Sequence, residues 1–321
     1  MRTSFWLLLV LCSCTKNVQD SATASEAGST PHETNNDGGT TGDDAAGDET
    51  AGTEAGDESG GITDGGEATS GGDDGEEGTG GEDDGDAEGG GEDPIEDQIV
   101  RFVALGDGGE GNTAQYAVGA AMKTVCDAKN DDDGDGCEFA LYLGDNFYND
   151  GVESIDDPQF ETKFEAPYAD ITFPFYVVLG NHDYGELSID LFRVPYQVEY
   201  TTRSSKWNMP NEFYTKSHEH ALFIGLDTNA IMVESILGDS GQETWLAGIH
   251  STNEAMWTVA FGHHPYISNG RHGNAGSYEG LPFIPIVSGG SVKDFFDAQI
   301  CGKVDVYISG HDHNRQWLQP T

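Results

Sequence analysis

The stretch Phe139-Ala-Leu-Tyr-Leu-Gly-Asp-Asn-Phe-Tyr148 joins five apolar residues to a glycine and then to a carboxylate. A short apolar run of this kind, with aromatic and aliphatic side chains, predicts a buried strand. Gly144 lets the chain turn sharply where the strand ends, so that Asp145 follows directly. In open α/β sheets, ligand sites form beyond the carboxyl ends of the strands. The stretch therefore predicts a strand that delivers a metal-capable side chain to such a site.

The same arrangement of apolar run, glycine and metal-capable side chain occurs five times along the chain. One such turn would be unremarkable, but turns do not require this series of carboxylate, amide and imidazole groups. Together these groups suit iron, manganese or zinc. The sequence therefore predicts that distant strands deliver ligands to one metal centre. The five clusters are Gly106-Asp107-Gly108-Gly109, Gly144-Asp145-Asn146-Phe147-Tyr148, Gly180-Asn181-His182-Asp183, Gly262-His263-His264-Pro265 and Gly310-His311-Asp312-His313.

Alternation of strands and helices predicts an α/β fold in which helices cover a largely parallel sheet. Residues 212–226 instead resemble an antiparallel hairpin, so the sheet system is expected to be mixed. The expected strands are Ile99–Leu105, Phe139–Leu143, Tyr176–Leu179, Glu212–Lys216, Ala221–Leu226, Trp257–Phe261 and Val304–Ser309. The expected helices are Thr113–Cys126, Pro158–Tyr168, Gln242–His250 and Ser291–Cys301.

Composition divides the 321 residues into three parts. Residues 1–14 form a signal or lipobox segment, and residues 15–97 form a Gly- and Thr-rich acidic linker with 26 acidic residues, one lysine and no aromatic residue. Such a linker cannot bury enough apolar surface to offset the ordering entropy, which predicts disorder. Residues 98–321 are apolar enough for one substantial core, and we assign the catalytic domain to them.

The formal net charge is −44. A chain this acidic would repel backbone phosphates, which argues against a nucleic-acid partner. Oligomeric state is not encoded in any pattern that we recognise.

Residues 5–11 form an apolar run that is too short to span a bilayer and fits the core of an export signal. Leu11-Cys12-Ser13-Cys14 resembles a bacterial lipobox, which implies lipidation of Cys14 and attachment to a membrane. An ordinary cleaved signal is the alternative. Either interpretation predicts an exported protein, as an envelope lipoprotein or in secreted form.

An exported protein occupies a compartment where disulfides persist. Cys126 and Cys137 flank a polar loop and are expected to form a bridge, whereas Cys301 is expected to be a buried free thiol. Within that loop, residues 131–136 resemble the start of a calcium loop. Position twelve would fall on Tyr142, which cannot supply the required carboxylate, so a solvated loop is expected.

The five clusters, in this order, resemble the signature of calcineurin-like metallophosphoesterases. Tyr148, three residues after Asp145, and the segment Gly310-His-Asp-His-Asn314 are most similar to the small, tartrate-resistant type of purple acid phosphatase. The resemblance implies a four-layer αββα sandwich of two mixed sheets flanked by helices. Relatives continue beyond the position of Thr321, so we expect either that the sequence is truncated or that its second sheet lacks an edge.

The resemblance also implies two metal ions and their ligands. Iron(III) would be held by Asp107, Asp145, Tyr148 and His313. A divalent iron, zinc or manganese ion would be held by Asp145, Asn181, His263 and His311, with Asp145 shared. His264 stands where the small type often has tyrosine, and we expect it to support the ligands from outside or to lie at the rim; direct binding of a metal is the alternative.

The implied reaction is hydrolysis of small phosphate monoesters by a metal-activated hydroxide. His182 and His272 match the histidines on the substrate side and would act as catalytic residues. The alternatives are a phosphodiesterase or nucleotide-directed enzyme of the same family, and a surface lipoprotein whose metal site is inert.

Overall fold

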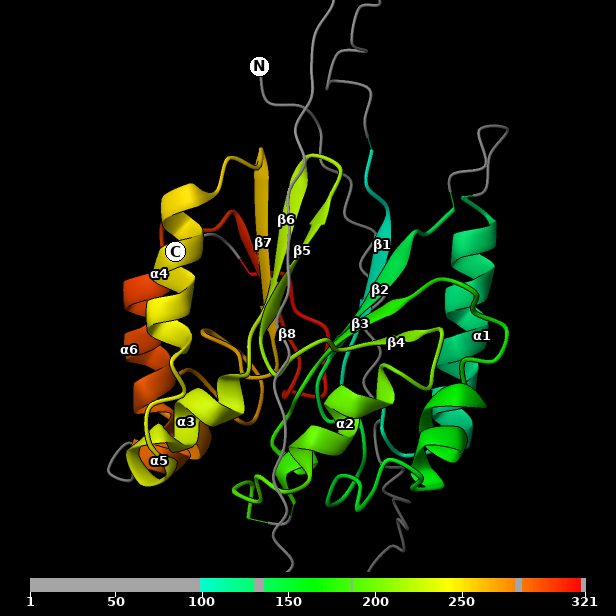
Figure 1. The fold of residues 1–321 in the computed structure, drawn as a ribbon, viewed down its shortest axis with the longest axis horizontal. Coiled ribbons are helices and arrows are strands. Elements are labelled where there is room, and N and C mark those ends of the chain that lie inside the picture. Colours follow the sequence, from blue (N-terminus) through cyan, green and yellow to red (C-terminus); the bar gives the residue numbers. More distant parts are fainter. Residues whose placement is uncertain (1–98, 130–135, 186, 281–284, 319–321) are drawn as a thin grey trace, which may run out of the picture. The chain divides into compact units, whose positions relative to one another are not determined.

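The computed structural model describes residues 99–129, 136–185, 187–280 and 285–318. The predicted signal segment, lipobox and acidic linker, and all but the last residue of the calcium-loop resemblance, lie outside the described residues. The described chain forms two four-stranded sheets with helices on both sides, an α/β architecture (Figure 1). We refer to them as sheet A and sheet B.

Sheet A contains strands β1 (Phe102–Leu105), β2 (Phe139–Leu143), β3 (Phe175–Val178) and β4 (Trp207–Asn208), side by side in that order and all parallel. Every residue of the first three strands is buried. Parallel strands covered on both faces are expected to be continuously apolar, which is why the sequence identified them well.

Sheet B contains strands β5 (Tyr214–His218), β6 (Ala221–Gly225), β7 (Trp257–Gly262) and β8 (Val306–Ser309). β5 and β6 form the antiparallel hairpin that the sequence predicts, and β6, β7 and β8 run parallel. Sheet B is therefore mixed as expected, whereas the described strands of sheet A all share one direction.

Sheet B buries side chains on both of its faces, in alternation along β6 and β7. Phe223 of β6 lies in the core between the sheets, where its ring meets those of Phe102 and Phe139 edge to face at 5.3 and 5.0 Å. Its neighbours Leu222 and Ile224 belong to a second core that includes residues of the helices. The two-residue period of a strand thus separates two apolar layers.

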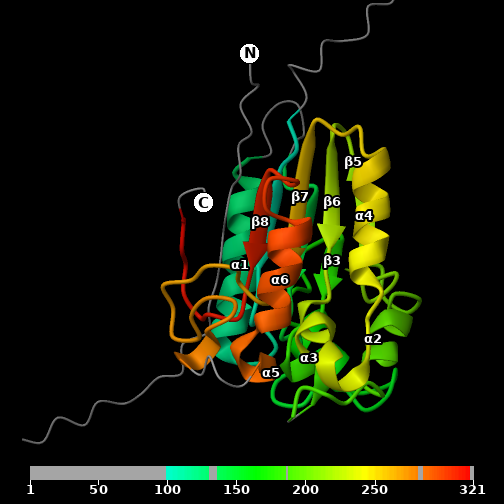
Figure 2. The same ribbon diagram turned by 90° about the vertical axis from the view of Figure 1, so that its left-hand side faces the viewer.

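Helices form the two outer layers. Figure 1 shows α1 (Thr113–Asp127) on the side of sheet A that faces away from sheet B, and α4 (Gln242–Thr252) and α6 (Gly290–Gln299) on the far side of sheet B. Figure 2 shows α6 in front of the strands of sheet B, α4 beside them and α3 (Thr228–Leu237) beyond their lower ends. The resulting order of helix, sheet, sheet and helix is the four-layer sandwich that the family resemblance implies.

Several elements differ from the sequence prediction. The helix expected at Pro158–Tyr168 is shorter and irregular: residues 159–160 are α-helical, Glu161–Glu165 is π-helical, and turns follow. α2 (Val194–Tyr200) and α3 were not predicted, because their local patterns did not separate them from loop. The short elements are η3 (His182–Tyr184), η4 (Tyr278–Gly280) and α5 (Pro285–Ser288).

The predicted disulfide between Cys126 and Cys137 is confirmed. The prediction of a buried Cys301 is wrong: this cysteine is free but exposed, because α6 ends at Gln299 and Cys301 lies in the turn that follows it. Among the described residues, no helix has the length and apolar character needed to cross a membrane.

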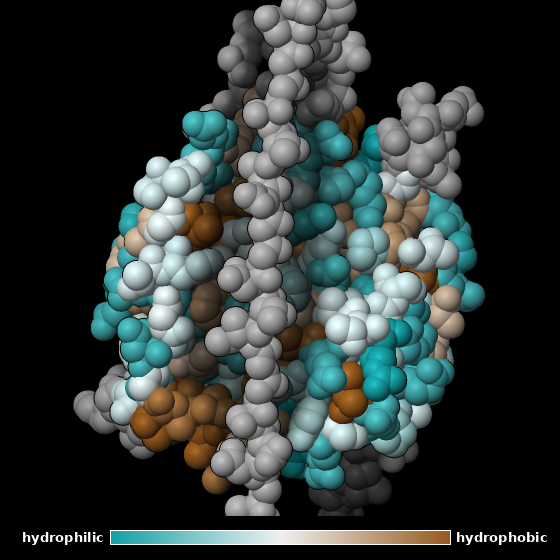
Figure 3. Space-filling model, in the orientation of Figure 1, coloured by the Kyte–Doolittle hydropathy of each residue, from teal (hydrophilic) through white to brown (hydrophobic). Residues whose placement is uncertain are grey.

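Figure 3 shows a mostly hydrophilic face, with an apolar patch at the lower left where Figure 1 places α3 and α5. The last residues of α3 are exposed there, Ile236 by 52% and Leu237 by 40%. This patch lies on a helix rather than on the strand ends.

Candidate metal centre

The predicted ligands meet where strands of both sheets end. Asp107 follows β1, Asp145 follows β2, and His311 follows β8, and all three have left-handed backbones with φ of 57°, 53° and 71°. Non-glycine residues rarely adopt this conformation, and they cluster at functional sites when the surroundings impose it. Gly180 allows the loops after β2 and β3 to touch, since a Cβ there would lie 2.3 Å from the Asp145 nitrogen.

Asp145 lies at the centre of the cluster. Its Oδ2 accepts a hydrogen bond from the Tyr148 hydroxyl at 3.0 Å, and its Oδ1 accepts one from the His182 backbone N–H at 3.0 Å. The same Oδ1 lies 3.4 Å from His263 Nε2. One carboxylate thus reaches residues of both sheets, the arrangement expected of a bridging ligand.

Asp107 and His313 complete one group of donor atoms around Asp145. Carboxylate oxygens of both aspartates and a nitrogen of His313 lie within 4.8 Å of one another. The Tyr148 hydroxyl lies 3.1 Å from His313 Nε2 and 3.4 Å from Asp107 Oδ1. The structure therefore brings together the four residues expected to hold iron(III).

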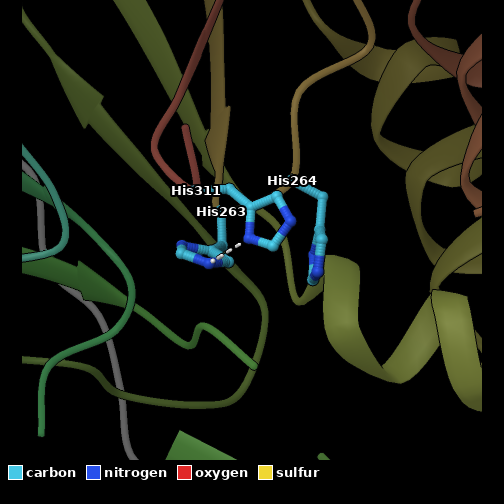
Figure 4. Close-up of side chains that lie close together, drawn as sticks. All are labelled: His263, His264 and His311. Carbon is cyan, nitrogen blue, oxygen red and sulfur yellow. Dashed lines mark hydrogen bonds between the residues drawn. The ribbon is translucent and has the colours of Figure 1, made fainter. Parts of the chain in front are cut away.

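The second expected ligand set also meets in space. His263 is fully buried, with Nδ1 2.9 Å from the carbonyl of Leu143. Its Nε2 lies 3.0 Å from Asn181 Oδ1 and 3.1 Å from His311 Nδ1, the contact drawn in Figure 4. The carbonyl of Leu143 fixes Nδ1 as the protonated nitrogen, which leaves Nε2 to face the other ligands.

His264 also belongs to this half of the centre. Its ring is fully buried, so a position at the rim is wrong; the strand end turns the side chain inward against α3. A ring nitrogen of His264 lies within 4.8 Å of ligand nitrogens of His263 and His311. Figure 4 shows the His311 ring between the other two.

The two expected catalytic histidines flank the cluster and are partly exposed. The His182 ring lies 4.6 Å from that of Tyr148, and its Nδ1 is 2.6 Å from the carbonyl of Asn149. The His272 ring lies 4.3 Å from that of His311, and its Nδ1 is 3.0 Å from Glu279 Oε1. Each ring is therefore held through Nδ1 by an oxygen acceptor.

Burial and charge act on the proton affinities of the cluster. Burial, with the negative charges of Asp145 and Asp107, raises the pKa of Tyr148, because a phenolate there would be poorly solvated. Burial lowers the pKa of His311 well below its usual range, and neighbouring imidazoles add to the shift. The hydrogen bond to Asp107 raises the pKa of His313.

The donor set fits metal ions. Asp107 and Asp145 are exposed by only 4% and 2%, and within the described residues no lysine or arginine pairs with either carboxylate. Two buried carboxylates with oxygens within 4.8 Å of each other are costly unless positive charge compensates them. Oxygen and imidazole donors together are the ligands that iron and zinc bind in proteins.

Asp183 organises the sheet A side of the metal centre, which is the part formed by the loops after β1, β2 and β3. The sequence did not predict this role. It is fully buried and accepts hydrogen bonds from the backbone N–H groups of Asn146, Phe147 and Gly180. Gln197 of α2 donates to it as well, at 3.0 Å. Burial raises the pKa of Asp183 to about 6, and the charge of Asp145 adds to this shift. Its place two residues after Asn181 was a usable signal, whereas Gln197 carried none.

Comparison with known proteins identifies the class. The family model for calcineurin-like phosphoesterases matches residues 100–315, and the chain belongs to this family. It is 28% identical to human tartrate-resistant acid phosphatase type 5 over 243 residues, which cover 68% of this chain and 69% of the relative. It is 29% identical to purple acid phosphatase 4 of Arabidopsis thaliana over 246 residues, which cover 70% and 65% of the two chains.

Among solved structures, the chain resembles purple acid phosphatase PPD1 from yellow lupin, with a TM-score of 0.43, 16% identity and coverage of 65% of this chain and 37% of that one. The chain spans about two thirds of the length of the curated relatives named above. Family membership makes it a metal-dependent phosphoester hydrolase, and relatives of this kind imply a dinuclear metal centre and small phosphate-ester substrates.

Proposed function

We propose that the protein hydrolyses phosphate monoesters in the manner of the purple acid phosphatases. The observation that carries this proposal is the position of Asp145, whose two oxygens face the two separate groups of ligands. A shared carboxylate between an oxygen-rich group and an imidazole group is what a dinuclear centre requires.

Asp107, Asp145, Tyr148 and His313 would hold an iron(III) ion, and Asp145, Asn181, His263 and His311 would hold a divalent iron, zinc or manganese ion. When bound, such a pair polarises phosphoryl oxygens and lowers the pKa of water enough to supply hydroxide at moderate pH. The chain contributes by holding oxygen ligands on rigid strand ends, where they need little reorganisation.

His182 and His272 would serve the substrate. Because Nδ1 of each ring contacts an oxygen acceptor, it carries a proton, and Nε2 remains for a substrate oxygen. In its protonated form, either Nε2 can donate a hydrogen bond to an equatorial phosphoryl oxygen or a proton to the leaving alcohol. Protonation of a histidine is favoured at acidic pH, which agrees with an acid phosphatase.

The test combines metal analysis with hydrolysis of a chromogenic phosphate monoester and the matching diester by the full chain. Two bound metals with preference for the monoester support the proposal. Preference for the diester would assign a phosphodiesterase instead, and bound metals without turnover of either ester would assign an inert site. His250→Gln is a suitable control, because this histidine of α4 contacts Gln299 away from the cluster.

The same proposal includes export, with lipidation of Cys14 as the means of attachment. The disulfide between Cys126 and Cys137 supports an oxidising compartment, because such bonds rarely persist in reducing ones. Membrane fractionation of wild type and Cys14→Ala tests it: the variant should leave the membrane fraction. An unchanged distribution would contradict the lipid anchor without bearing on the phosphatase.

A further inference from the structure

His264 has a ring nitrogen that the described structure leaves without a partner. The ring is fully buried, and Nε2 has no hydrogen-bond partner. Buried polar atoms are nearly always satisfied, so each exception in a native fold calls for an explanation such as an ion. Two histidines among the described residues have a buried ring nitrogen without a hydrogen-bond partner. His264 lies at the candidate metal centre, and His220 lies in the β5–β6 turn.

The other side of the His264 ring is held by Thr228, the first residue of α3. The threonine Oγ1 lies 2.9 Å from His264 Nδ1, and it accepts a hydrogen bond from the His264 backbone N–H at 3.0 Å. A hydroxyl oxygen has two lone pairs, so it can accept both N–H groups. In the tautomer in which the hydroxyl accepts both N–H groups, Nδ1 carries the ring proton and Nε2 keeps a lone pair. This is the tautomer in which metal-binding histidines are usually held by an outer oxygen.

The backbone fixes the position of the ring. The Tyr307 hydroxyl of β8 donates to the carbonyl of His264 at 2.8 Å. The ring centroid lies 4.6 Å from that of His311 and 5.0 Å from that of His263. Nitrogens of these three histidines lie within 4.8 Å of one another, and an ion with metal–nitrogen bonds of about 2.1 Å spans most of that separation.

We propose that His264 is a ligand of the divalent metal ion, so that the imidazole group provides three nitrogens from His263, His264 and His311. The inference rests on the dinuclear centre of the proposed function and adds a ligand to it. Three imidazoles favour zinc, copper, nickel or iron over manganese, magnesium and calcium, which prefer oxygen ligands. The divalent site is therefore selective for a borderline metal such as zinc.

The test is a zinc titration of the metal-free full chain, followed by zinc-edge X-ray absorption. Asp107→Ala with His313→Ala serves as the background, so that one site remains. In this background, His264→Asn retains a polar group opposite Thr228 and removes Nε2. His264→Gln instead places a side-chain amide atom near the position of Nε2. His220→Asn is the matched control, because it also removes a histidine with an unpartnered buried nitrogen, and no potential metal-binding cluster among the described residues includes it.

We expect His264→Asn to weaken zinc binding at least about 100-fold, since loss of an outer-shell partner alone costs roughly 10- to 100-fold. The number of imidazoles around zinc should fall by one, manganese affinity should change less, and His264→Gln should restore part of the loss. Unchanged zinc affinity and imidazole number in His264→Asn, or an equal loss in His220→Asn, would overturn the inference.

The phosphatase proposal and the assignment of His264 as a ligand can be tested independently of each other. If wild type turns over phosphate esters while His264→Asn binds zinc normally, the ligand assignment is wrong and the phosphatase stands. If the zinc result is as expected but no ester is hydrolysed, the ligand assignment stands and the phosphatase does not.

Discussion

The two sides of the metal centre are built by different means. The sheet A side supplies Asp107, Asp145, Tyr148 and Asn181, a set of oxygen donors. The sheet B side supplies imidazoles, with His311 and His263 rings 4.9 Å apart. Oxygen donors suit a hard ion such as iron(III), and imidazoles suit a borderline divalent ion. The two sheets therefore supply different donors: in the proposed assignment the iron(III) site takes three of its four ligands from the sheet A side, and the divalent site takes two from each side.

The means of support differ as well. On the sheet A side, the fully buried Asp183 ties the loops after β2 and β3 together through backbone N–H groups. On the sheet B side, rings pack on one another and Thr228 of α3 holds His264. Hydrogen bonds orient ligands on both sides, and on the sheet B side the packing of rings on one another adds to them. Substitutions on the two sides should consequently have different effects.

Removal of the shared ligand should cause the largest effect. Asp145→Ala deletes the one carboxylate that reaches both sides, so both metals should be lost or weakened and monoester hydrolysis should fall by at least about 1,000-fold. Metal content and steady-state kinetics measure this. Retention of both metals with near-normal turnover would mean that the sides do not share Asp145.

His182→Ala should lower kcat by roughly 100- to 10,000-fold while both metals stay bound, because general acid catalysis contributes about that much. The comparison with Asp145→Ala separates a residue that serves substrate from one that holds metal. His250→Gln should behave as wild type in both assays. Loss of metal from His182→Ala would reassign this histidine to the metal side.

Asp183→Asn should weaken metal binding by about 10- to 100-fold, as expected for a residue that orients ligands without binding metal. The variant keeps the size of the side chain but loses acceptor capacity for the N–H groups of Asn146, Phe147 and Gly180. Equilibrium dialysis against zinc and iron measures the change. The iron(III) site should suffer more than the divalent site; equal losses would contradict the division into two sides.

Tyr148→Phe should change colour more than activity. With iron(III) bound, tyrosinate gives a visible charge-transfer band, so wild type should be purple and the variant colourless. Because Asp107, Asp145 and His313 remain, the fall in kcat should be less than about 10-fold, well below the cost of a lost general acid. If the wild-type protein is colourless and contains two zinc ions, its assignment to the purple subtype is wrong, whereas its assignment as a phosphoesterase stands.

The smallest effect concerns the stability of the sheet B side. Burial raises the pKa of Asp227, the N-cap of α3, to about 7. Because the folded pKa exceeds the unfolded one, the folded state binds more protons, and stability falls as pH rises from about 4 through 7. Asp227→Asn keeps an acceptor for the Ala230 N–H but cannot titrate. Without metal, the Tm of the variant should therefore fall less than that of wild type over this pH range. Equal changes of Tm with pH in the two proteins would contradict the prediction.

Much of the fold and centre could be predicted from sequence because the signals are local. An apolar run followed by glycine and a polar ligand marks each of β1, β2, β3, β7 and β8, and within each sheet the ends of parallel neighbours meet at one edge. The hairpin of β5 and β6 and the disulfide of Cys126 with Cys137 are also short-range features.

Other features depended on contacts between distant residues, and only the tertiary structure decided them. The hydrogen bond from Gln197 to Asp183 joins an unpredicted helix to a strand end, and the pairing of Thr228 with His264 crosses 36 residues. Side-chain type determined which chemistry this chain can perform, since carboxylate and imidazole are properties of single residues. Burial and mutual distance are properties of the packed whole, which is why the roles of Asp183 and His264 emerged only after folding brought their partners together.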